Sequence, residues 1–333
     1  MPEYLVVRCH GLATHLLPKQ AIEALTSSKN IKEIADILAS TDYGDKIREL
    51  KEVDAYSLEQ IFTEELIKRY MHVINASSDE TQDFLKVYAK RFEVQSLARI
   101  LRSKIAKTSR DIKSFIPLIQ DFSSLNLNRL IEAESIEKIV EMLKGTAYSQ
   151  IIKSLDLYRK YNSILPLEVQ LKKTYYQMVF EALETFPSGD QEEIKEILGI
   201  EIDAANCFTA LAPLLYGYAS ELTKQLLIPF FFKVPLSSFK EVMESKSLHT
   251  ALTLLKSYEN VVKPLIEKGE EALAEVNALK LLRRKVEELM LKSSLSFAYV
   301  ISYLVLCEIE WRNLVLTTFL TQQNLEVKPY LII

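Results

Sequence analysis

The sequence predicts an all-α protein, and three observations carry that prediction. Its 333 residues include only 7 glycines, whereas glycine usually makes up about 7% of a protein. Strands and phosphate-binding loops need glycine where the backbone turns. Leu, Ile, Lys, Glu and Ala dominate the composition, and all of them except the β-branched Ile are strong helix formers. Finally, an acidic residue followed three positions later by a small polar residue and an apolar helical stripe occurs three times.

The three copies of this pattern lie about 110 residues apart and pair Glu93 with Ser96, Asp203 with Asn206, and Glu310 with Asn313. A period this long exceeds that of solenoid repeats, so each copy is expected to belong to a small helical domain. We expect these domains to span residues 1–108, 109–218 and 219–333. Residues three apart are neighbours on one helix face, and a buried Asn has to be hydrogen-bonded. The pairs are therefore expected to fix how helices pack and not to catalyse a reaction.

A second match supports the first two repeats. Residues Asn30–Leu50 align without gaps on Ser135–Leu155 at a constant offset of 105 residues, and the alignment includes a Thr-x-Tyr motif that ends at Tyr43 and Tyr148. Any two amphipathic helices share apolar spacing, but the common motif and the gapless length make coincidence the weaker explanation. In the third repeat the match fades to two apolar positions within residues 238–256.

In chain order, the first repeat is expected to begin with three helices and to continue with two long ones. Apolar residues at a period near 3.6 predict the first three, over Tyr4–Leu17, Ala21–Leu25 and Ile31–Leu38. The S-x-x-Q pattern of Ser57 and Gln60 is typical of a capping box that opens a long helix. The helix with Glu93 follows over residues 84–105.

The second repeat is expected to keep this order. Pro166 opens its long helix. In the turn that follows, Asp190 and Glu193 form another capping pair, ahead of the helix that carries Asp203. Pro213 is expected to bend or end that helix.

The third repeat is expected to hold a regular helix over Ile266–Leu291, followed by the helix with Glu310. Its most apolar stretch, Phe297–Cys307, has 11 residues, and a bilayer span needs about 20. No segment is therefore expected to cross a membrane. The tail after Pro329 is apolar, and we expect it to be docked because exposed apolar surface is costly in water.

Charge and cysteine content narrow the class of protein. A formal net charge of −4 gives no overall attraction to nucleic acid or anionic lipid. Cys9, Cys207 and Cys307 lie far apart and form no C-x-x-C pair, so reduced, buried thiols of a cytosolic protein are expected. The N-terminal residues do not have the apolar core of a signal peptide.

Motifs for catalysis, nucleotide binding and metal binding are absent from the sequence. It contains no H-E-x-x-H, G-x-S-x-G, P-loop or dinucleotide-binding pattern. His10 and His15 are five residues apart, so they do not share a helix face as a zinc-binding i,i+4 pair would. Cys9 and His10 are adjacent, but neighbours on a helix point in directions about 100° apart. We expect a protein without catalytic residues, cofactor or metal.

One stretch, residues 86–113, is strongly basic in an otherwise acidic chain. Such a run of basic residues usually forms a solvent-exposed helix face. Binding of single-stranded RNA would need stacking aromatic residues, and only Tyr88 and Phe92 are near. Docking of an acidic protein partner through Arg99 and Arg102 fits at least as well. The basic residues outnumber Glu93 and Asp111 by nine to two: Lys86, Lys90, Arg91, Arg99, Arg102, Lys104, Lys107, Arg110 and Lys113.

The order and spacing of these motifs resemble the family of C subunits of archaeal and bacterial A/V-type ATP synthases, whose eukaryotic V-type counterpart is the d subunit. In that family three repeats each contain a helix with the pattern acidic-x-x-Asn-Leu, followed by aliphatic residues and often Arg. The chain is similar at Glu93 and Arg102, with Ser96 in place of Asn, at Asp203 and Asn206, and at Glu310 and Asn313. Leu226–Leu236 is similar to the family's Leu-Ile-Pro loop, and Tyr4, Arg8, Leu16 and Leu17 to its N-terminal helix. The likeness covers nearly the whole chain.

This resemblance implies three helical domains related by a pseudo-threefold axis and forming a funnel-shaped socket. The socket would be a peripheral subunit on the cytoplasmic face of the membrane, seated on the rotor ring of proteolipid subunits and holding the central-shaft subunits D and F. It would couple ion flow to ATP synthesis, or ATP hydrolysis to ion pumping, without binding nucleotide or nucleic acid. Phe230, Phe231 and Phe232 are candidates for the grip on a partner. The alternatives are a helical adaptor unrelated to ATP synthases and an RNA-binding protein that uses residues 86–113.

Overall fold

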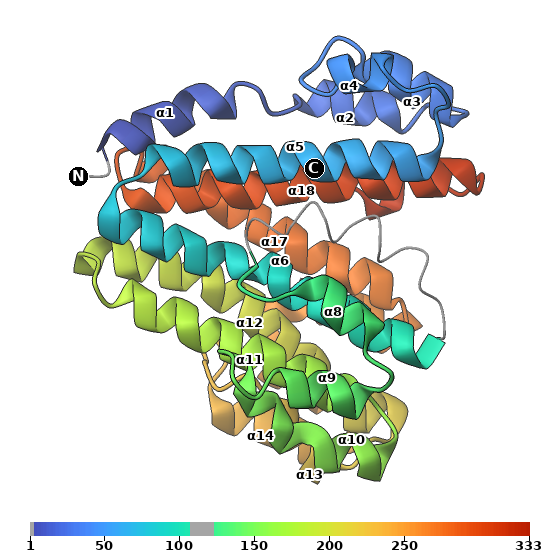
Figure 1. The fold of residues 1–333 in the computed structure, drawn as a ribbon. Coiled ribbons are helices and arrows are strands. Elements are labelled where there is room, and N and C mark those ends of the chain that lie inside the picture. The colour runs from blue at the N-terminus through green and yellow to red at the C-terminus, as the bar shows by residue number, and fades with distance from the viewer. Residues whose placement is uncertain (1–2, 107–122) are drawn as a thin grey trace. The chain divides into compact units, whose positions relative to one another are not determined.

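The computed structural model describes residues 3–106 and 123–333, and every secondary-structure element in these two ranges is a helix (Figure 1). The all-α prediction is confirmed. The chain divides into two compact units. Unit 1 comprises residues 1–78, 187–204 and 258–333, and unit 2 comprises residues 79–186 and 205–257.

Unit 1 is built around two long helices that pack side by side, α5 (Ala55–Ala76) and α18 (Phe297–Gln322) (Figure 1). A third long helix, α17 (Glu271–Lys292), packs against α18. The unit also contains the first part of the long helix α12 (Ser188–Tyr216), as far as Ala204. Its short elements are α1 (Glu3–Ala13), α2 (Lys19–Leu25), α3 (Ile31–Leu38), α4 (Gly44–Arg48), α16 (Glu259–Lys268) and the 3-10 helix η4 (Lys328–Tyr330).

Helix α5 begins one turn earlier than the sequence pattern predicts. Asp54 is its N-cap, and the Asp54 side chain accepts a hydrogen bond of 2.7 Å from the backbone N–H of Ser57. The Ser57 hydroxyl accepts one of 3.0 Å from the N–H of Asp54 in return. The predicted capping box of Ser57 and Gln60 is therefore wrong, because the stronger N-cap carboxylate of Asp54 lies three residues upstream.

Helix α1 ends at Ala13, whereas the sequence predicts a helix to Leu17. The N–H groups of residues 14–16 bond three residues back, as in a turn. Leaving the helix frees the backbone N–H of Leu17, which donates a hydrogen bond of 2.5 Å to the carboxylate of Glu310 on α18. The early end of α1 thus supplies a donor to a buried charge.

The predicted helix over Ile266–Leu291 is in fact two helices. α16 ends at Lys268, and Gly269 adopts a left-handed conformation with φ of 67° before α17 begins at Glu271. Glycine adopts this conformation without the steric cost that a side chain imposes, and it is the usual residue for ending a helix in this way.

Helix α12 (Ser188–Tyr216) begins inside the predicted turn, and Asp190 and Glu193 do not cap it. Asp190 accepts a hydrogen bond of 3.0 Å from the N–H of Phe297. The hydroxyl of Ser296 lies 2.7 Å from Asp190 and 2.6 Å from Glu193, so the two carboxylates share its single proton. Both carboxylates therefore bind the N-terminus of α18, where the helix dipole favours negative charge. Pro213 lies in the last turn of α12.

Among the described residues, α12 is the one helix that is long and apolar enough to cross a membrane by length and composition. Its apolar window has a mean hydropathy of 1.3, and 67% of that window is buried inside the structure. Core helices pass the same test, so this is weak evidence for a span. The predicted candidate, Phe297–Cys307, forms the first part of α18.

Unit 2 has a second pair of packed long helices, α6 (Asp79–Ala106) and α11 (Leu165–Leu183) (Figure 1). The end of α12 belongs to this unit, and the 3-10 helix η3 (Lys256–Tyr258) crosses its boundary. Its short helices are α8 (Leu127–Glu132), α9 (Ile136–Met142), η2 (Ser149–Ser154), α10 (Leu155–Tyr161), α13 (Ser220–Leu226), α14 (Leu236–Glu244) and α15 (Leu248–Leu254).

Three short helices, α3, α9 and α15, begin in the same way. Their N-cap side chains, those of Asn30, Ser135 and Ser247, each accept a hydrogen bond from the N–H three residues further on. A tyrosine follows each helix. The number of residues between the N-cap and this tyrosine is the same for Tyr43 and Tyr148, and it is two smaller for Tyr258. This shorter spacing hides the third match in the sequence. The two positions that kept the phase, Phe239 and Val242, are instead buried residues of α14.

The apolar tail is docked, as predicted. Leu331 and Ile332 are fully buried, and Leu331 belongs to the core cluster that α2, α3 and α5 form with α18.

Candidate functional site

The carboxylate of Glu310 lies in the core of unit 1, where only 3% of the residue is exposed. It accepts hydrogen bonds of 2.7 Å from the hydroxyl of Tyr43 and 2.7 Å from the guanidinium of Arg69, besides the bond from Leu17. The three donors come from α5 and from the segments that flank α2 and α3. Glu310 therefore ties the C-terminal helix α18 to the first segments of the chain.

Arg69 balances the charge of Glu310 in the same buried space. Its residue is 4% exposed, and its guanidinium also lies 3.5 Å from Glu65 and 3.6 Å from Asp42. Burial by itself lowers the pKa of Arg69, but its electrostatic interactions with Tyr43 and with the carboxylate of Glu310 raise the pKa above its usual value. Burial and the charge of Glu310 also raise the pKa of Tyr43 well above normal, so its hydroxyl keeps the proton that it donates.

Glu93 occupies a comparable position in unit 2 and is completely buried. It accepts hydrogen bonds from the hydroxyl of Tyr148 at 2.6 Å, the hydroxyl of Ser123 at 2.7 Å and the N–H of Ser124 at 2.8 Å. Lys90 is the nearby cation, at 3.5 Å. Burial and the charge of Glu93 raise the pKa of Tyr148 above its usual range.

Asp203 is the third buried acid of the pattern, and it accepts a hydrogen bond of 3.2 Å from the hydroxyl of Tyr258. Each of the three acids thus meets the tyrosine that follows one of the helices α3, α9 and α15. In two of the pairs, Glu93–Tyr148 and Asp203–Tyr258, the partners are 55 residues apart. Sequence reasoning missed this pairing, although the equal spacing was a signal that could have revealed it.

The predicted asparagines are buried and bond to backbone that lies outside the helices. The Asn206 amide accepts a hydrogen bond from the N–H of Ile228 at 2.8 Å and donates to the carbonyl of the same residue at 3.0 Å. Asn313 makes the same two bonds to Ile332, both at 3.0 Å. Ser96 only donates to the carbonyl of Phe92 in its own helix, at 2.8 Å. Asn206 and Asn313 therefore clamp loop segments rather than neighbouring helices.

The segment clamped by Asn206 presents aromatic side chains at the surface of unit 2. We call residues 228–234 the docking loop. Phe231 is 36% exposed and Phe232 is 39% exposed. Phe230 instead packs on Phe180 of α11, with 4.2 Å between the ring centroids. The bonds of Asn206 fix the root of the loop, so the two exposed rings are held on an ordered backbone.

The described part of the basic stretch is largely engaged within unit 2. Arg91 is buried and donates to the hydroxyl of Tyr175 at 3.1 Å. Arg102 binds Glu168 with two hydrogen bonds of 2.7 Å and 3.0 Å, and Lys104 donates to the carbonyl of Ile131. Arg99 is half-buried. Lys107, Arg110 and Lys113 lie outside the described residues.

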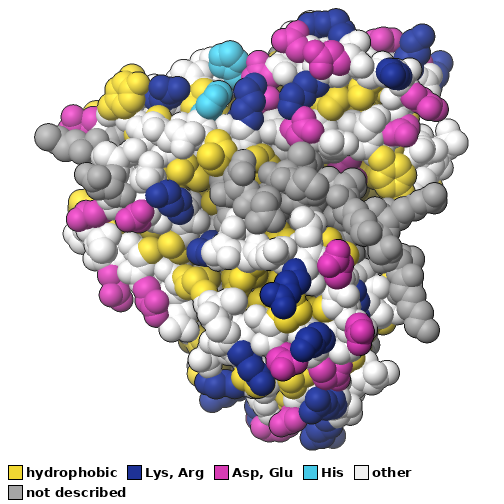
Figure 2. Space-filling view, viewed as in Figure 1, with side chains coloured by type: hydrophobic (Ala, Val, Ile, Leu, Met, Phe, Trp, Pro, Cys, Tyr) yellow, Lys and Arg dark blue, Asp and Glu magenta, His cyan; other side chains and the backbone are white. Residues whose placement is uncertain are grey.

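The aromatic residues that would be needed to bind single-stranded RNA do not lie at the surface. Tyr88 and Phe92, the aromatic residues that RNA stacking would require, are buried. On the face shown in Figure 2, basic and acidic side chains are interspersed. Residues 3–106 and 123–333 contain no group of three or more His, Cys, Asp or Glu side chains placed to hold a metal ion. All three cysteines are buried thiols, and burial raises the pKa of Cys9 and of Cys307 to about 12.

Comparison with known proteins gives one consistent result. The model of the family described as ATP synthase (C/AC39) subunit matches residues 5–328. The C subunit of the A-type ATP synthase from Methanocaldococcus jannaschii is 24% identical over 324 residues, covering 93% of this chain and 80% of the relative. Its counterpart from Pyrococcus furiosus is 23% identical over 320 residues, covering 93% and 84%. The one from Methanosarcina mazei is 26% identical over 206 residues, covering 61% and 56%.

Proposed function

Because the chain belongs to the ATP synthase (C/AC39) subunit family, we propose that it is the rotor subunit that joins the membrane ring of an A/V-type ATP synthase to the central shaft. The observation that carries this proposal is the family match over residues 5–328, which includes parts of both units and all three buried acids. In this role the protein passes torque from ring to shaft during ATP synthesis, and from shaft to ring during ATP-driven ion pumping. It catalyses no reaction itself and binds no nucleotide.

A torque-carrying subunit has to be stiff, and the interior of each unit supports that requirement. Long helices pack in pairs, α5 with α18 and α6 with α11. Buried carboxylates with several donors hold their partners in one geometry, because any shift would leave a buried charge without hydrogen bonds. Glu310 does this across the two ends of the chain.

We propose further that residues 1–108, 109–218 and 219–333 are three repeats related by a pseudo-threefold axis, which form a funnel-shaped socket. Two kinds of observation support the repeats. The three buried acids each bond to a tyrosine, and the helices before these tyrosines share one capping arrangement. Glu310 of the last repeat binds Tyr43 of the first, a connection expected of a cyclic arrangement.

The partners proposed are the proteolipid subunits of the ring and the shaft subunits D and F. Exposed ion pairs contribute only about 0–1 kcal/mol each. Most of the free energy of binding to the ring and the shaft therefore has to come from buried apolar area, at roughly 25 cal/mol per Å². Phe231 and Phe232 are exposed aromatic residues on an ordered loop, which suits them to this task. Phe230 packs on Phe180 and thereby holds the loop against α11. The protein would be a peripheral subunit on the cytoplasmic face of the membrane.

The test of the docking loop is a double substitution, Phe231→Ser with Phe232→Ser. We expect ion-driven ATP synthesis in reconstituted vesicles to fall several-fold, while circular dichroism of the free subunit stays unchanged. Ile152→Ser is the matched control, since Ile152 is 42% exposed in the same unit. It should leave synthesis intact. A double variant that folds and still couples fully would remove the loop from the grip.

Arg99 and Arg102 are proposed to steer an acidic partner surface toward the protein. Arg102 is already paired with Glu168, so a simple charge reversal would also break an internal contact. The exchange Arg102→Glu with Glu168→Arg keeps the pair and reverses the charge at position 102, whose side chain is 62% exposed. Assembly of the complex should slow at low salt and recover at high salt, where steering is screened. Equal assembly rates at low salt would contradict the steering role.

A further inference from the structure

The last residues of the chain pack on the core of unit 1, and we call residues 327–333 the tail strap. Val327, Leu331 and Ile332 are buried. Val327 and Leu331 belong to the same core cluster as residues of α2, α3 and α5 and Leu314 of α18. The tail strap therefore completes the core that the first helices of the chain share with the long helices.

Three hydrogen bonds to the backbone of the tail strap meet at Ile332. The amide of Asn313 on α18 accepts one from the N–H of Ile332 and donates one to its carbonyl, both at 3.0 Å. The guanidinium of Arg283 on α17 donates one of 2.7 Å to the same carbonyl. Lys328 and Pro329 are exposed. The backbone of the tail strap is thus anchored near its end, while its first half faces solvent.

The connection from α18 to the tail strap is a turn at the surface. Residues 323–326 are all exposed, and Asn324 adopts a left-handed conformation with φ of 54°. After glycine, asparagine is among the residues that adopt this conformation most readily. A segment that follows an exposed turn can leave its place while the helix before the turn stays intact.

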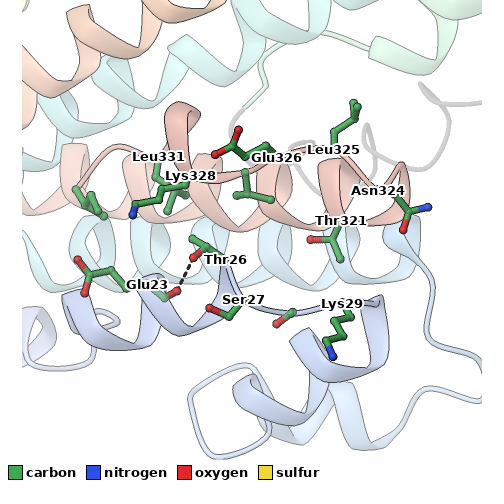
Figure 3. Close-up of a pocket in the computed structure, with 13 residues that line it drawn as sticks. Glu23, Thr26, Ser27, Lys29, Thr321, Asn324, Leu325, Glu326, Lys328 and Leu331 are labelled. Atoms are coloured by element: carbon green, nitrogen blue, oxygen red, sulfur yellow. Dashed lines mark hydrogen bonds between the residues drawn. The ribbon is translucent and has the colours of Figure 1, made fainter.

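A pocket of about 850 Å³ lies between the tail strap and the connection from α2 to α3 (Figure 3). Ser28 and Thr321 line it, and their hydroxyl oxygens are shielded from solvent without a hydrogen-bond partner among the residues that the structure describes. An unpaired buried hydroxyl lowers stability, and native proteins contain few of them. The packing beside the tail strap is therefore incomplete, and it includes two polar groups that would gain hydrogen bonds if water reached them.

We propose that the tail strap opens and closes while the long helices of unit 1 stay packed. In the open state Leu331 leaves the core, α2 and α3 lose part of the apolar surface on which they pack, and water bonds to the hydroxyls of Ser28 and Thr321. Segments with an exposed backbone and few buried contacts open locally in this way. The tail strap is a device of this chain alone, so the proposal goes beyond the rotor role and does not depend on it.

Hydrogen exchange of the full-length chain tests the proposal without any substitution. Ile332 and Phe62 are both buried in unit 1, but Phe62 lies in the middle of α5. The N–H of Ile332 should exchange at least about tenfold faster than that of Phe62, and low concentrations of urea should hardly change its rate, because little surface is exposed by a local opening. Exchange of both N–H groups at the same urea-dependent rate would overturn the proposal.

Leu331→Cys provides a second measurement, with Leu58→Cys as the matched control. Both leucines are fully buried in the same core cluster, but Leu58 lies on α5. The chain's own three cysteines are buried. A thiol reagent should label Cys at position 331 about tenfold faster than Cys at position 58, once the stability of each variant is taken into account. Equal labelling rates would mean that the tail strap opens only when the whole core unfolds.

Thr321→Val tests the part played by the unpaired hydroxyl. The substitution removes a group that is unsatisfied only in the closed state, so it should slow the exchange of the Ile332 N–H about fivefold. Thr318→Val is the matched control one turn earlier on α18, because the Thr318 hydroxyl donates to the carbonyl of Leu314 at 2.8 Å. It should not slow this exchange. Unchanged or faster exchange in Thr321→Val would contradict the proposed open state, in which water bonds to this hydroxyl.

Discussion

Glu310 in unit 1 and Glu93 in unit 2 are both buried carboxylates that accept a hydrogen bond from the tyrosine of a Thr-x-Tyr motif, yet their charges are balanced differently. Glu310 faces Arg69, which is itself buried. Glu93 is surrounded by hydroxyl and backbone donors, and its cation Lys90 lies further away with 19% of its side chain exposed. The repeated pattern therefore keeps the acid and the tyrosine at both sites of this molecule, while the compensating groups differ from site to site.

The difference has an energetic consequence. Removing one member of a buried ion pair leaves an uncompensated buried charge, whereas removing a carboxylate from neutral donors leaves only unpaired hydrogen-bonding groups. Loss of the carboxylate should therefore lower the stability of the protein more at Glu310 than at Glu93. It is also the site that joins the two ends of the chain, through Leu17 and Tyr43.

The largest effect is expected from Glu310→Gln. It should lower the free energy of unfolding by about 3–5 kcal/mol, because the buried Arg69 loses its shortest ion pair and keeps only the longer contacts with Glu65 and Asp42. Glu93→Gln should cost about 1–3 kcal/mol, since it disturbs hydrogen bonds but strands no buried cation. Urea unfolding followed by circular dichroism measures both. Equal losses for the two variants would mean that Arg69 is not what distinguishes the sites.

Arg69→Met in the Glu310→Gln background sharpens the same comparison. Replacing Arg69, which has lost its shortest ion pair, by an apolar side chain of similar length should recover part of the stability lost in the single variant. The other acids near Arg69, Glu65 and Asp42, prevent full recovery because they also lose a partner. A double variant less stable than Glu310→Gln alone would contradict the assignment of Arg69 as the stranded charge.

A smaller effect is expected from the asparagine clamps. Asn206→Ala and Asn313→Ala each remove two hydrogen bonds to buried backbone, so each should cost about 1–3 kcal/mol. Only Asn206 fixes the root of the docking loop. We therefore expect Asn206→Ala to reduce ion-driven ATP synthesis more than Asn313→Ala does at matched stability. Equal losses of synthesis would show that the clamp serves stability alone.

The smallest effect concerns the thiols. With a pKa of about 12, Cys9 and Cys307 are almost entirely protonated at neutral pH, and Cys207 is also buried. Thiolate is the reactive form, so titration with a thiol reagent near neutral pH should detect essentially none of the three cysteines in the native protein. All three should react after unfolding. Fast labelling of the native protein would show that the cores around these residues open.

The sequence was sufficient for the fold class, because helix formers and helical spacing are local properties. It also showed the repeated pattern of Glu93, Asp203 and Glu310, but not that all three carboxylates are buried. It was insufficient for contacts that depend on long-range packing. Asp190 and Glu193 have the spacing of a helix cap, but their oxygens bind the start of α18, more than a hundred residues away. Likewise nothing local to Glu310 indicates that its cation is Arg69 on α5. For the basic stretch, a charge count could not show internal partners such as Glu168, which binds Arg102.

Covalent linkage of this protein to its neighbours tests the rotor role most directly. Phe232→Cys gives one exposed thiol in a chain whose own cysteines are buried, so a bifunctional reagent can join it to the ring or to the shaft in the assembled complex. ATP-driven ion pumping is then measured before and after linkage. If the protein turns with ring and shaft, the linked complex keeps its pumping rate, because no relative motion has been blocked. Linkage to ring or shaft that stops pumping would contradict the account.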